Sequence, residues 1–234
     1  MDLFEAIRTT RAMRRLDPGR PVSDADVRTI LEAALKGPTG GNQQPIRWLV
    51  IRDQDTKDGL QEIYQRCWNR GRKPYAAEPG RIAPAVLNSA DHLAANLHLS
   101  PVLILACADT GPQGRRHDAS VYPSVQNLML AARALGLGTT LTTAHLFEEE
   151  AVKELLGIPS HVTTYALIPV GHPLGKWGEP KRRPLEEVTY LDRWGRPGAS
   201  GASGVAGAGA NGANGANGAN GANGANGADG GGPV

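Results

Sequence analysis

The segment Ser120–Leu135 constrains the fold most, because it predicts a helix with apolar side chains on nearly every side. One face carries Val121, Val125, Leu128, Met129, Ala132 and Leu135, and the opposite side carries Leu130, Ala131 and Ala134. A helix that is apolar nearly all round is usually buried. We therefore expect a central helix, or one at a subunit interface, against which the other elements pack.

The carboxyl-terminal stretch from Gly198 onward has almost no apolar side chain larger than alanine. It consists mainly of Gly, Ala, Ser and Asn, and the triplet GAN repeats from about residue 209 to residue 227. Burial of such side chains cannot offset the entropy that is lost when the chain is ordered. The sequence therefore predicts one domain, residues 1–197, followed by a disordered tail, residues 198–234.

The composition argues against several classes of protein. The formal net charge is only +2, so we do not expect a nucleic acid as the main partner. The two cysteines are too few for a disulfide framework. The first residues lack the apolar segment of a secretory signal, and the longest apolar run, Val102–Ala108, is too short to span a membrane. We expect a soluble cytoplasmic protein.

The hydrophobic pattern predicts helices and strands in alternation, which favours an α/β or α+β layer fold. The expected helices are a short one capped by Asp2 with Leu3, Ala6 and Ile7 inward, one capped by Ser23, and others near Leu60–Cys67, Pro84–Leu97, Ser120–Leu135 and Glu148–Leu156. The expected strands are Ile46–Arg52, Val102–Ala108 and Val162–Val170, with a last extended piece at Glu187–Leu191. No GxGxxG follows a first strand, so a dinucleotide-binding βαβ unit is not expected.

Two segments are predicted to be irregular. Gly37–Val50 (GPTGGNQQPIRWLV) combines glycines, prolines and polar side chains between a helix and a strand, which suits either a binding loop or an ordinary turn. Trp68–Ile82 is basic and rich in glycine and proline, which predicts a loop that is either a lid or a disordered insertion. Its aromatic side chains would cover a flat ligand or pin the loop to the core.

The sequence contains no pattern of a protein-borne catalyst. GxSxG, HExxH and CxxC are absent, and the six histidines lack metal-ligand spacing. Two clusters of basic residues stand out: Arg11, Arg14 and Arg15 near the amino end, and Lys181, Arg182 and Arg183 near the end of the domain. Arginine binds phosphate through two parallel hydrogen bonds, so the clusters could close on one phosphate. From spacing alone, solvated surface charge is the more common fate of such runs.

Four motifs in order resemble the nitroreductase-like flavoproteins, over about residues 2–195. The motifs are RTTRAMRRL, PTGGNQQPIRWLVI, QNLMLAARALGLGTT, and PVGHP followed by a PKRR segment. The resemblance implies an α+β fold, with a mixed sheet flanked by helices, in an intertwined homodimer whose chain ends reach over their partners. It also implies FMN held non-covalently at two sites in the dimer interface.

The resemblance assigns candidate contacts to the flavin phosphate and to the edge of the ring. Arg11, Ala12 and Arg14 match the amino-terminal flavin contacts of the family. Arg11 would hold the phosphate, and Arg14 would favour negative charge on the reduced ring. Lys181 and Arg183 match the carboxyl-terminal phosphate pair.

Two further segments match parts of the family that lie close to the ring. The segment beside the ring, where a backbone N–H would meet flavin N5, corresponds to Leu141, Thr142 and Thr143. The loop that reaches the flavin of the other subunit corresponds to Pro38, Thr39, Gly40 and Asn42. Many members have serine at the positions of Ala12 and Thr39, tryptophan at that of Ile46, and a Glu-Gly pair at that of Thr142-Thr143.

The resemblance predicts an FMN-dependent oxidoreductase without catalytic side chains or a metal, because the chemistry occurs at flavin N5. NADPH or NADH would reduce the flavin, which would then reduce a small-molecule acceptor such as a nitroaromatic or a quinone. Two alternatives remain: an oxidase or dehydrogenase that acts on a biosynthetic intermediate, and a flavin-binding protein without turnover. The departures from the family pattern leave the first alternative open.

Overall fold

The computed structural model describes residues 1–77, 82–111, 114 and 116–196. It divides into two compact units, Met1–Lys181 and Arg182–Val234. The predicted tail, residues 198–234, lies outside the described residues, and so do residues 78–81 and 197. No helix in the described ranges is long and apolar enough to cross a membrane.

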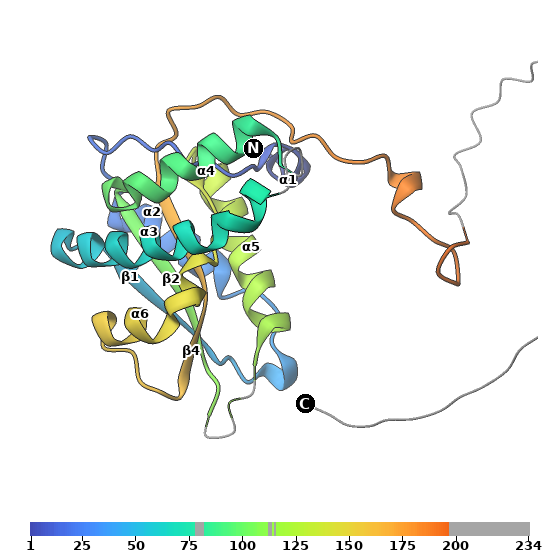
Figure 1. Cartoon of the computed structure of the whole chain (residues 1–234). Coiled ribbons are helices and arrows are strands. Elements are labelled where there is room, and N and C mark those ends of the chain that lie inside the picture. Colours follow the sequence, from blue (N-terminus) through green and yellow to red (C-terminus); the bar gives the residue numbers. More distant parts are fainter. Residues whose placement is uncertain (78–81, 112–113, 115, 197–234) are drawn as a thin grey trace, which may run out of the picture. The chain divides into compact units, whose positions relative to one another are not determined.

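A four-stranded antiparallel sheet forms the centre of the first unit (Figure 1). Its strands are β1 (Ile46–Ile51), β2 (Val102–Asp109), β3 (Gly138–Thr139) and β4 (Val162–Gly171), in the order β1-β2-β4-β3. The α+β class is confirmed, but the prediction of a mixed sheet is wrong for this chain. Within the described residues, parallel pairing is limited to one bridge between Ala12 and Thr139. Two helices connect β1 to β2, and the chain enters β2 in the direction opposite to β1, so these neighbouring strands pair antiparallel.

Helices cover both faces of the sheet (Figure 1). One face packs against α2 (Asp24–Ala34) and α5 (Asp118–Ala134), and the other against α3 (Gln54–Ala77), α4 (Pro84–Asn96) and α6 (Glu149–Leu156). In β2, Ile104 belongs to the first core and its neighbour Leu105 to the second. A strand that is covered on both faces is apolar throughout, as the run Val102–Ala108 is.

The structure confirms the prediction that the apolar helix is central. In α5, four side chains of the predicted face are completely buried: Val121, Val125, Leu128 and Ala132. They pack against the strands and α2 in the first core. Met129 is partly buried, but Leu135, which was predicted on the same face, follows the last residue of the helix and is 42% exposed. The carboxyl end of α5 carries Arg133, which is also buried.

The first helix, α1 (Leu3–Thr9), differs from its prediction in the direction of its apolar face. Asp2 caps it as expected, because its side chain accepts a hydrogen bond from the Glu5 N–H at 2.9 Å. Ala6 is buried, but Leu3 and Ile7 are 62% and 51% exposed, so the prediction that they point inward is wrong. Within one chain, α1 packs mainly on α5, and this contact buries Ala6 but not Leu3 or Ile7.

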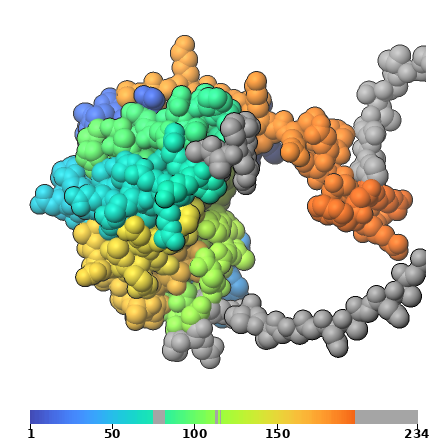
Figure 2. Space-filling view, viewed as in Figure 1, coloured from blue at the N-terminus to red at the C-terminus, as the bar shows by residue number. Residues whose placement is uncertain are grey.

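The prediction of a loop at Trp68–Ile82 is wrong over most of this segment, because α3 continues to Ala77. Trp68 and Arg72, one turn apart, both donate hydrogen bonds to Asp91 on α4. These contacts stabilise helix where the glycines and Pro74 disfavour it, which is a case of tertiary packing overriding local propensity. The two helices lie against each other on the face shown in Figure 2.

The described part of the second unit, residues 182–196, is short and mostly irregular. A 3₁₀ turn, η4 (Leu185–Glu187), is followed by a hydrogen bond from the Thr189 hydroxyl to the Leu185 carbonyl at 2.8 Å. The predicted extended piece Glu187–Leu191 is therefore wrong at its start, where these local bonds turn the chain. Tyr190 and Trp194 bring their ring centroids to 4.6 Å.

Candidate functional site

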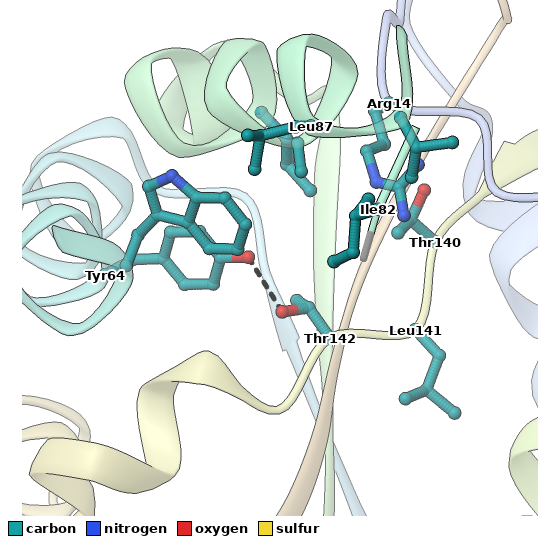
Figure 3. A pocket seen from close by; sticks show the side chains of 11 residues that line it. Arg14, Tyr64, Ile82, Leu87, Thr140, Leu141 and Thr142 are labelled. Atoms are coloured by element: carbon teal, nitrogen blue, oxygen red, sulfur yellow. Dashed lines mark hydrogen bonds between the residues drawn. The ribbon is translucent and has the colours of Figure 1, made fainter. Parts of the chain in front are cut away.

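The segment after α1 runs beside β3, and this pairing fixes the position of Arg14. The Met13 N–H donates to the Thr139 carbonyl at 2.8 Å, and the Thr140 hydroxyl donates to the Met13 carbonyl at 2.9 Å. A Cβ at Gly138 would come within 2.8 Å of the Met13 Cβ, so only glycine permits this close approach. The Arg14 side chain is then directed into a cavity (Figure 3).

Thr142 is held from two sides. Its Oγ1 lies 2.7 Å from the hydroxyl oxygen of Tyr64 on α3. Its N–H donates to the Leu167 carbonyl at 3.0 Å, and its carbonyl accepts from the Leu167 N–H at 2.9 Å. By contrast, the N–H groups of Leu141 and Thr143 have no hydrogen-bond partner within the described residues. These two groups, and not the N–H of Thr142, can therefore donate to a ligand.

Arg14, Tyr64 and Thr142 border one cavity of about 160 Å³ (Figure 3). The rest of its wall is mainly apolar and comes largely from α3, α4 and the segment after β3: Trp68, Ile82, Val86, Leu87, Ala90, Leu93, Thr140 and Leu141. Sites that enclose a small ligand usually measure roughly 300–1,000 Å³. A ligand with three fused rings would therefore extend beyond the space that one chain encloses.

The cavity combines the positive charge of Arg14 with the neutral phenol of Tyr64. Burial lowers the pKa of Arg14 from its usual value, and the nearby Tyr64 opposes this change. Burial raises the pKa of Tyr64, against the effects of its hydrogen bond with Thr142 and of the Arg14 charge. Near neutral pH, Arg14 is therefore charged and Tyr64 is protonated. An apolar cavity with this pair suits a flat ligand that carries hydrogen-bond acceptors on one edge.

A three-residue link fixes Trp68 in the cavity wall. The Trp68 indole N–H donates to Asp91 Oδ1 at 2.8 Å, and Arg72 donates to both carboxylate oxygens, at 2.7 and 3.0 Å. The hydrogen bonds from Arg72 are the main reason that the pKa of Asp91 is lowered. The predicted site did not include Tyr64, Arg72 or Asp91. The signals present in the sequence were a tyrosine on the buried helix face, which needs a hydroxyl partner, and the i,i+4 spacing of Trp68 and Arg72.

The residues predicted to bind the phosphate do not all belong to the same unit of the chain. Arg11 and Ala12 are exposed, and Arg11 Nη1 lies 3.9 Å from the position that a Cβ of Gly178 would take. Lys181, three residues later, ends the first unit and is exposed as well. The structure therefore brings Arg11 close to the segment that leads to Lys181. Arg183 belongs to the second unit, where it is exposed.

The predicted loop Pro38, Thr39, Gly40 and Asn42 lies apart from this cavity. Its residues Pro38, Thr39 and Gly40 line a separate hollow that is completed by Arg116, His117, Ala119 and Ser120 around the start of α5. Gly41 and Asn42 have φ values of 59° and 54°, so the backbone passes through the left-handed region here. One chain therefore does not bring the loop together with Arg14 and Thr142.

The comparisons with known proteins agree on a family. A model described as "Nitroreductase family" matches residues 7–172. A "Putative NADH dehydrogenase/NAD(P)H nitroreductase" from Methanothermobacter thermautotrophicus is 29% identical over 202 residues, which are 83% of this chain and 88% of that protein. A solved structure from Desulfovibrio desulfuricans, "a putative nitroreductase in complex with fmn", has a TM-score of 0.60 and 28% identity and covers 83% of this chain and 98% of its own. Iodotyrosine deiodinase bound to FMN and 3-iodo-L-tyrosine has a TM-score of 0.67 over 82% of this chain and 98% of its own; at 23% identity it shows the fold alone.

Proposed function

This chain belongs to the nitroreductase family of flavin oxidoreductases, and we propose that it binds FMN, accepts electrons from NAD(P)H and passes them to a small-molecule acceptor such as a nitroaromatic or a quinone. The family that the motifs predicted is confirmed by the family model, which matches residues 7–172. The observation that carries the proposal is the charge of Arg14 in an apolar cavity that is also lined by Leu141, whose N–H has no hydrogen-bond partner within the described residues.

The donors of this cavity fit a flavin. FMN, when bound, supplies the hydride and electron transfer, so the protein needs to bind, orient and tune it. The pyrimidine edge of a flavin is rich in hydrogen-bond acceptors, and Arg14 and the N–H of Leu141 are donors from residues that line the cavity. The positive charge of Arg14 would also stabilise negative charge on a reduced ring. This role needs no acid–base pair of side chains.

The remaining residues of the site have binding roles in this proposal. Arg11, Lys181 and Arg183 would hold the phosphate, with Ala12 beside them. Trp68 and Leu87 form part of an apolar wall that keeps water from the ring and suits a flat, weakly polar acceptor. The apolar wall is the reason that we favour aromatic and quinone acceptors over strongly charged ones.

Three observations support a homodimer with a shared site. The cavity of one chain is smaller than a flavin ring requires, and the loop Pro38–Asn42 lines a different hollow. On α1, the large apolar side chains Leu3, Phe4 and Ile7 are at least half exposed, which is unusual unless a partner covers them. We propose that a second copy covers this face and that its loop completes the site.

An absorbance spectrum of the purified full-length chain, before and after anaerobic NADPH or NADH, tests the proposal. We expect the bands of oxidised flavin and their rapid loss on reduction. Arg14→Met should reduce flavin content and slow the bleaching, whereas Arg28→Met, at an exposed arginine of α2, should change neither. Protein that neither contains flavin nor takes up added FMN would overturn the proposal. Flavin that only another substrate bleaches would favour the oxidase or dehydrogenase alternative.

A further inference from the structure

Arg133, at the carboxyl end of α5, is buried although it carries a charge, with only 7% of the residue exposed. Its Nε donates a hydrogen bond to the Thr9 hydroxyl at 2.9 Å. The guanidinium carbon lies 4.1 Å from the ring centroid of Trp177. A buried cation is costly unless its surroundings compensate for lost water, and a hydroxyl acceptor and an aromatic face do so here. Arg133 thus contacts two segments that are far apart in the sequence.

The contact with Thr9 fixes the end of α1. The Thr9 hydroxyl donates its own hydrogen to the Glu5 carbonyl at 2.7 Å, so its lone pairs are left for Arg133. Arg11 follows Thr9 by two residues. This hydrogen bond ties the end of α1 to α5, and Arg11 lies between it and the hydrogen bond from the Met13 N–H to the Thr139 carbonyl.

The contact with Trp177 fixes the segment that leads to Lys181. Gly178 follows Trp177 directly, and Arg11 Nη1 lies 3.9 Å from where its Cβ would be. An ion pair between Arg8 and Glu179, at 2.7 Å, joins the same two segments, but both side chains are more than 60% exposed. Because exposed ion pairs contribute little in water, the buried contacts of Arg133 are the stronger link.

We propose that Arg133 is a positioning residue that holds Arg11 and the segment ending at Lys181 together, so that both can bind the phosphate group of the flavin. This role rests on the proposed FMN-dependent function. Arg133 itself does not contact the phosphate, since its guanidinium is buried between Thr9 and Trp177. Phosphate binding by arginine depends on the direction of its hydrogen bonds, so a small displacement of Arg11 weakens it.

The test compares FMN with riboflavin, which has the same ring but no phosphate. Full-length chain is freed of flavin, and the dissociation constant of each flavin is measured by fluorescence quenching. The variants are Arg133→Met, Arg133→Lys, Trp177→Leu and the milder Thr9→Val, which removes only the hydroxyl acceptor. The matched control is Arg70→Met, because Arg70 also lies over an aromatic ring, that of Phe147, at 5.4 Å, but outside the site.

For Arg133→Met and Trp177→Leu we expect FMN binding to weaken about tenfold while riboflavin binding changes less than about twofold. Arg133→Lys should be intermediate, because it keeps the charge but loses the planar group. The control should bind both flavins as the wild type does. If Arg133→Met fails to fold, the Thr9→Val variant provides the test. We expect its affinity for FMN to fall about threefold and its affinity for riboflavin to stay unchanged.

Equal losses for FMN and riboflavin would show that Arg133 only supports the fold and would overturn the positioning role. Unchanged affinity for FMN in all four variants would overturn it as well. A wild-type chain that binds neither flavin would be a different result, since it would overturn the proposed function itself.

Discussion

The hydroxyl oxygens of Tyr64 and Thr142 lie 2.7 Å apart, although the residues are 78 positions apart in the sequence. Their hydrogen bond joins α3 to the segment after β3, and it lies in the wall of the cavity that we assign to the flavin (Figure 3). Tyr64 is almost completely buried, so its hydroxyl is shielded from water. The bond therefore links the packing of α3 to the place of Thr142 and of its neighbours Leu141 and Thr143.

Thr142→Val keeps the shape of the side chain and removes the partner of the Tyr64 hydroxyl. A buried hydroxyl without a partner costs about 1–3 kcal/mol, and we expect a loss of that size in the free energy of unfolding, measured in urea. Tyr64→Phe removes the other hydroxyl and should cost about 1 kcal/mol. The double variant should be more stable than the sum of the two losses predicts, because each single change already breaks the same bond. Additive losses would show that the two hydroxyls do not interact.

Asp91→Ala should destabilise the contact between α3 and α4, because it removes the carboxylate that accepts from both Trp68 and Arg72. We expect a loss of about 1–3 kcal/mol in urea unfolding and a higher KM for the acceptor, since Trp68 lines the cavity. The control is Glu32→Gln in the exposed pair with Arg28, which should cost less than about 0.5 kcal/mol. An unchanged KM would show that Asp91 stabilises the packing of α3 on α4 but does not affect binding of the acceptor.

The sequence predicts the elements of this fold better than their contacts. The run Val102–Ala108 can be recognised in the sequence because burial on both faces of the sheet leaves no polar positions, and the helix from Ser120 because the apolar side chains of one face are completely buried. The direction of α1 could not be predicted, since its apolar face remains exposed in one chain. The extension of α3 to Ala77 is stabilised by Asp91, which lies on another helix. Local helix propensity contains no information about such a tertiary partner.

The same difference between predictable elements and unpredictable contacts applies to the candidate residues of the site. Arg14 and Thr142 were assigned by resemblance, and they border one cavity. Tyr64 was predicted only as part of the helix near Leu60–Cys67, because nothing in the sequence pairs it with a residue 78 positions away. The flavin contacts assigned to all these residues remain predictions. For Arg183 and the loop Pro38–Asn42, the predicted role also depends on contacts beyond the first unit of one chain.

Phe4→Asp should prevent formation of the proposed homodimer. Phe4 is 77% exposed on α1, beside Leu3 and Ile7, and a carboxylate there would have to be buried when a second copy covers this face. Burial of an unpaired charge costs several kcal/mol, so the dimer should weaken by about 100-fold or more. Light scattering during gel filtration would show the change in mass. A variant that stays dimeric would place the interface elsewhere.

Removal of residues 198–234 should leave the flavin content and the rate of flavin reduction unchanged. The reason is compositional, because this stretch contains no Lys, Arg or aromatic residue that would bind a phosphate or stack on a ring. The absorbance spectrum of the truncated chain, compared with that of the full chain, gives the result directly. A clear loss of FMN would show that the tail takes part in the site.

His145 should make the fold sensitive to acid. The residue lies in the 3₁₀ turn Ala144–Glu148, directly after the segment beside the cavity, and is 1% exposed. Within the described residues, neither ring nitrogen has a hydrogen-bond partner. Burial lowers its pKa from 6.5 to about 4, so the folded state disfavours the proton that the unfolded state accepts.

The sign of the effect follows from the two pKa values. Above about pH 6.5 the ring is neutral in both states, and stability is unaffected. As the pH falls from 6.5 to about 4, the unfolded state binds the proton first, and the fold should lose up to about 3 kcal/mol. Urea unfolding at several pH values, for the wild type and for His145→Leu, isolates this contribution from that of the carboxylates. The His145→Leu variant should lose less stability than the wild type between pH 6.5 and 4. The control His161→Gln, at an exposed histidine, should follow the wild type. Equal curves for all three proteins would show that His145 is protonated in the folded state as readily as in the unfolded chain.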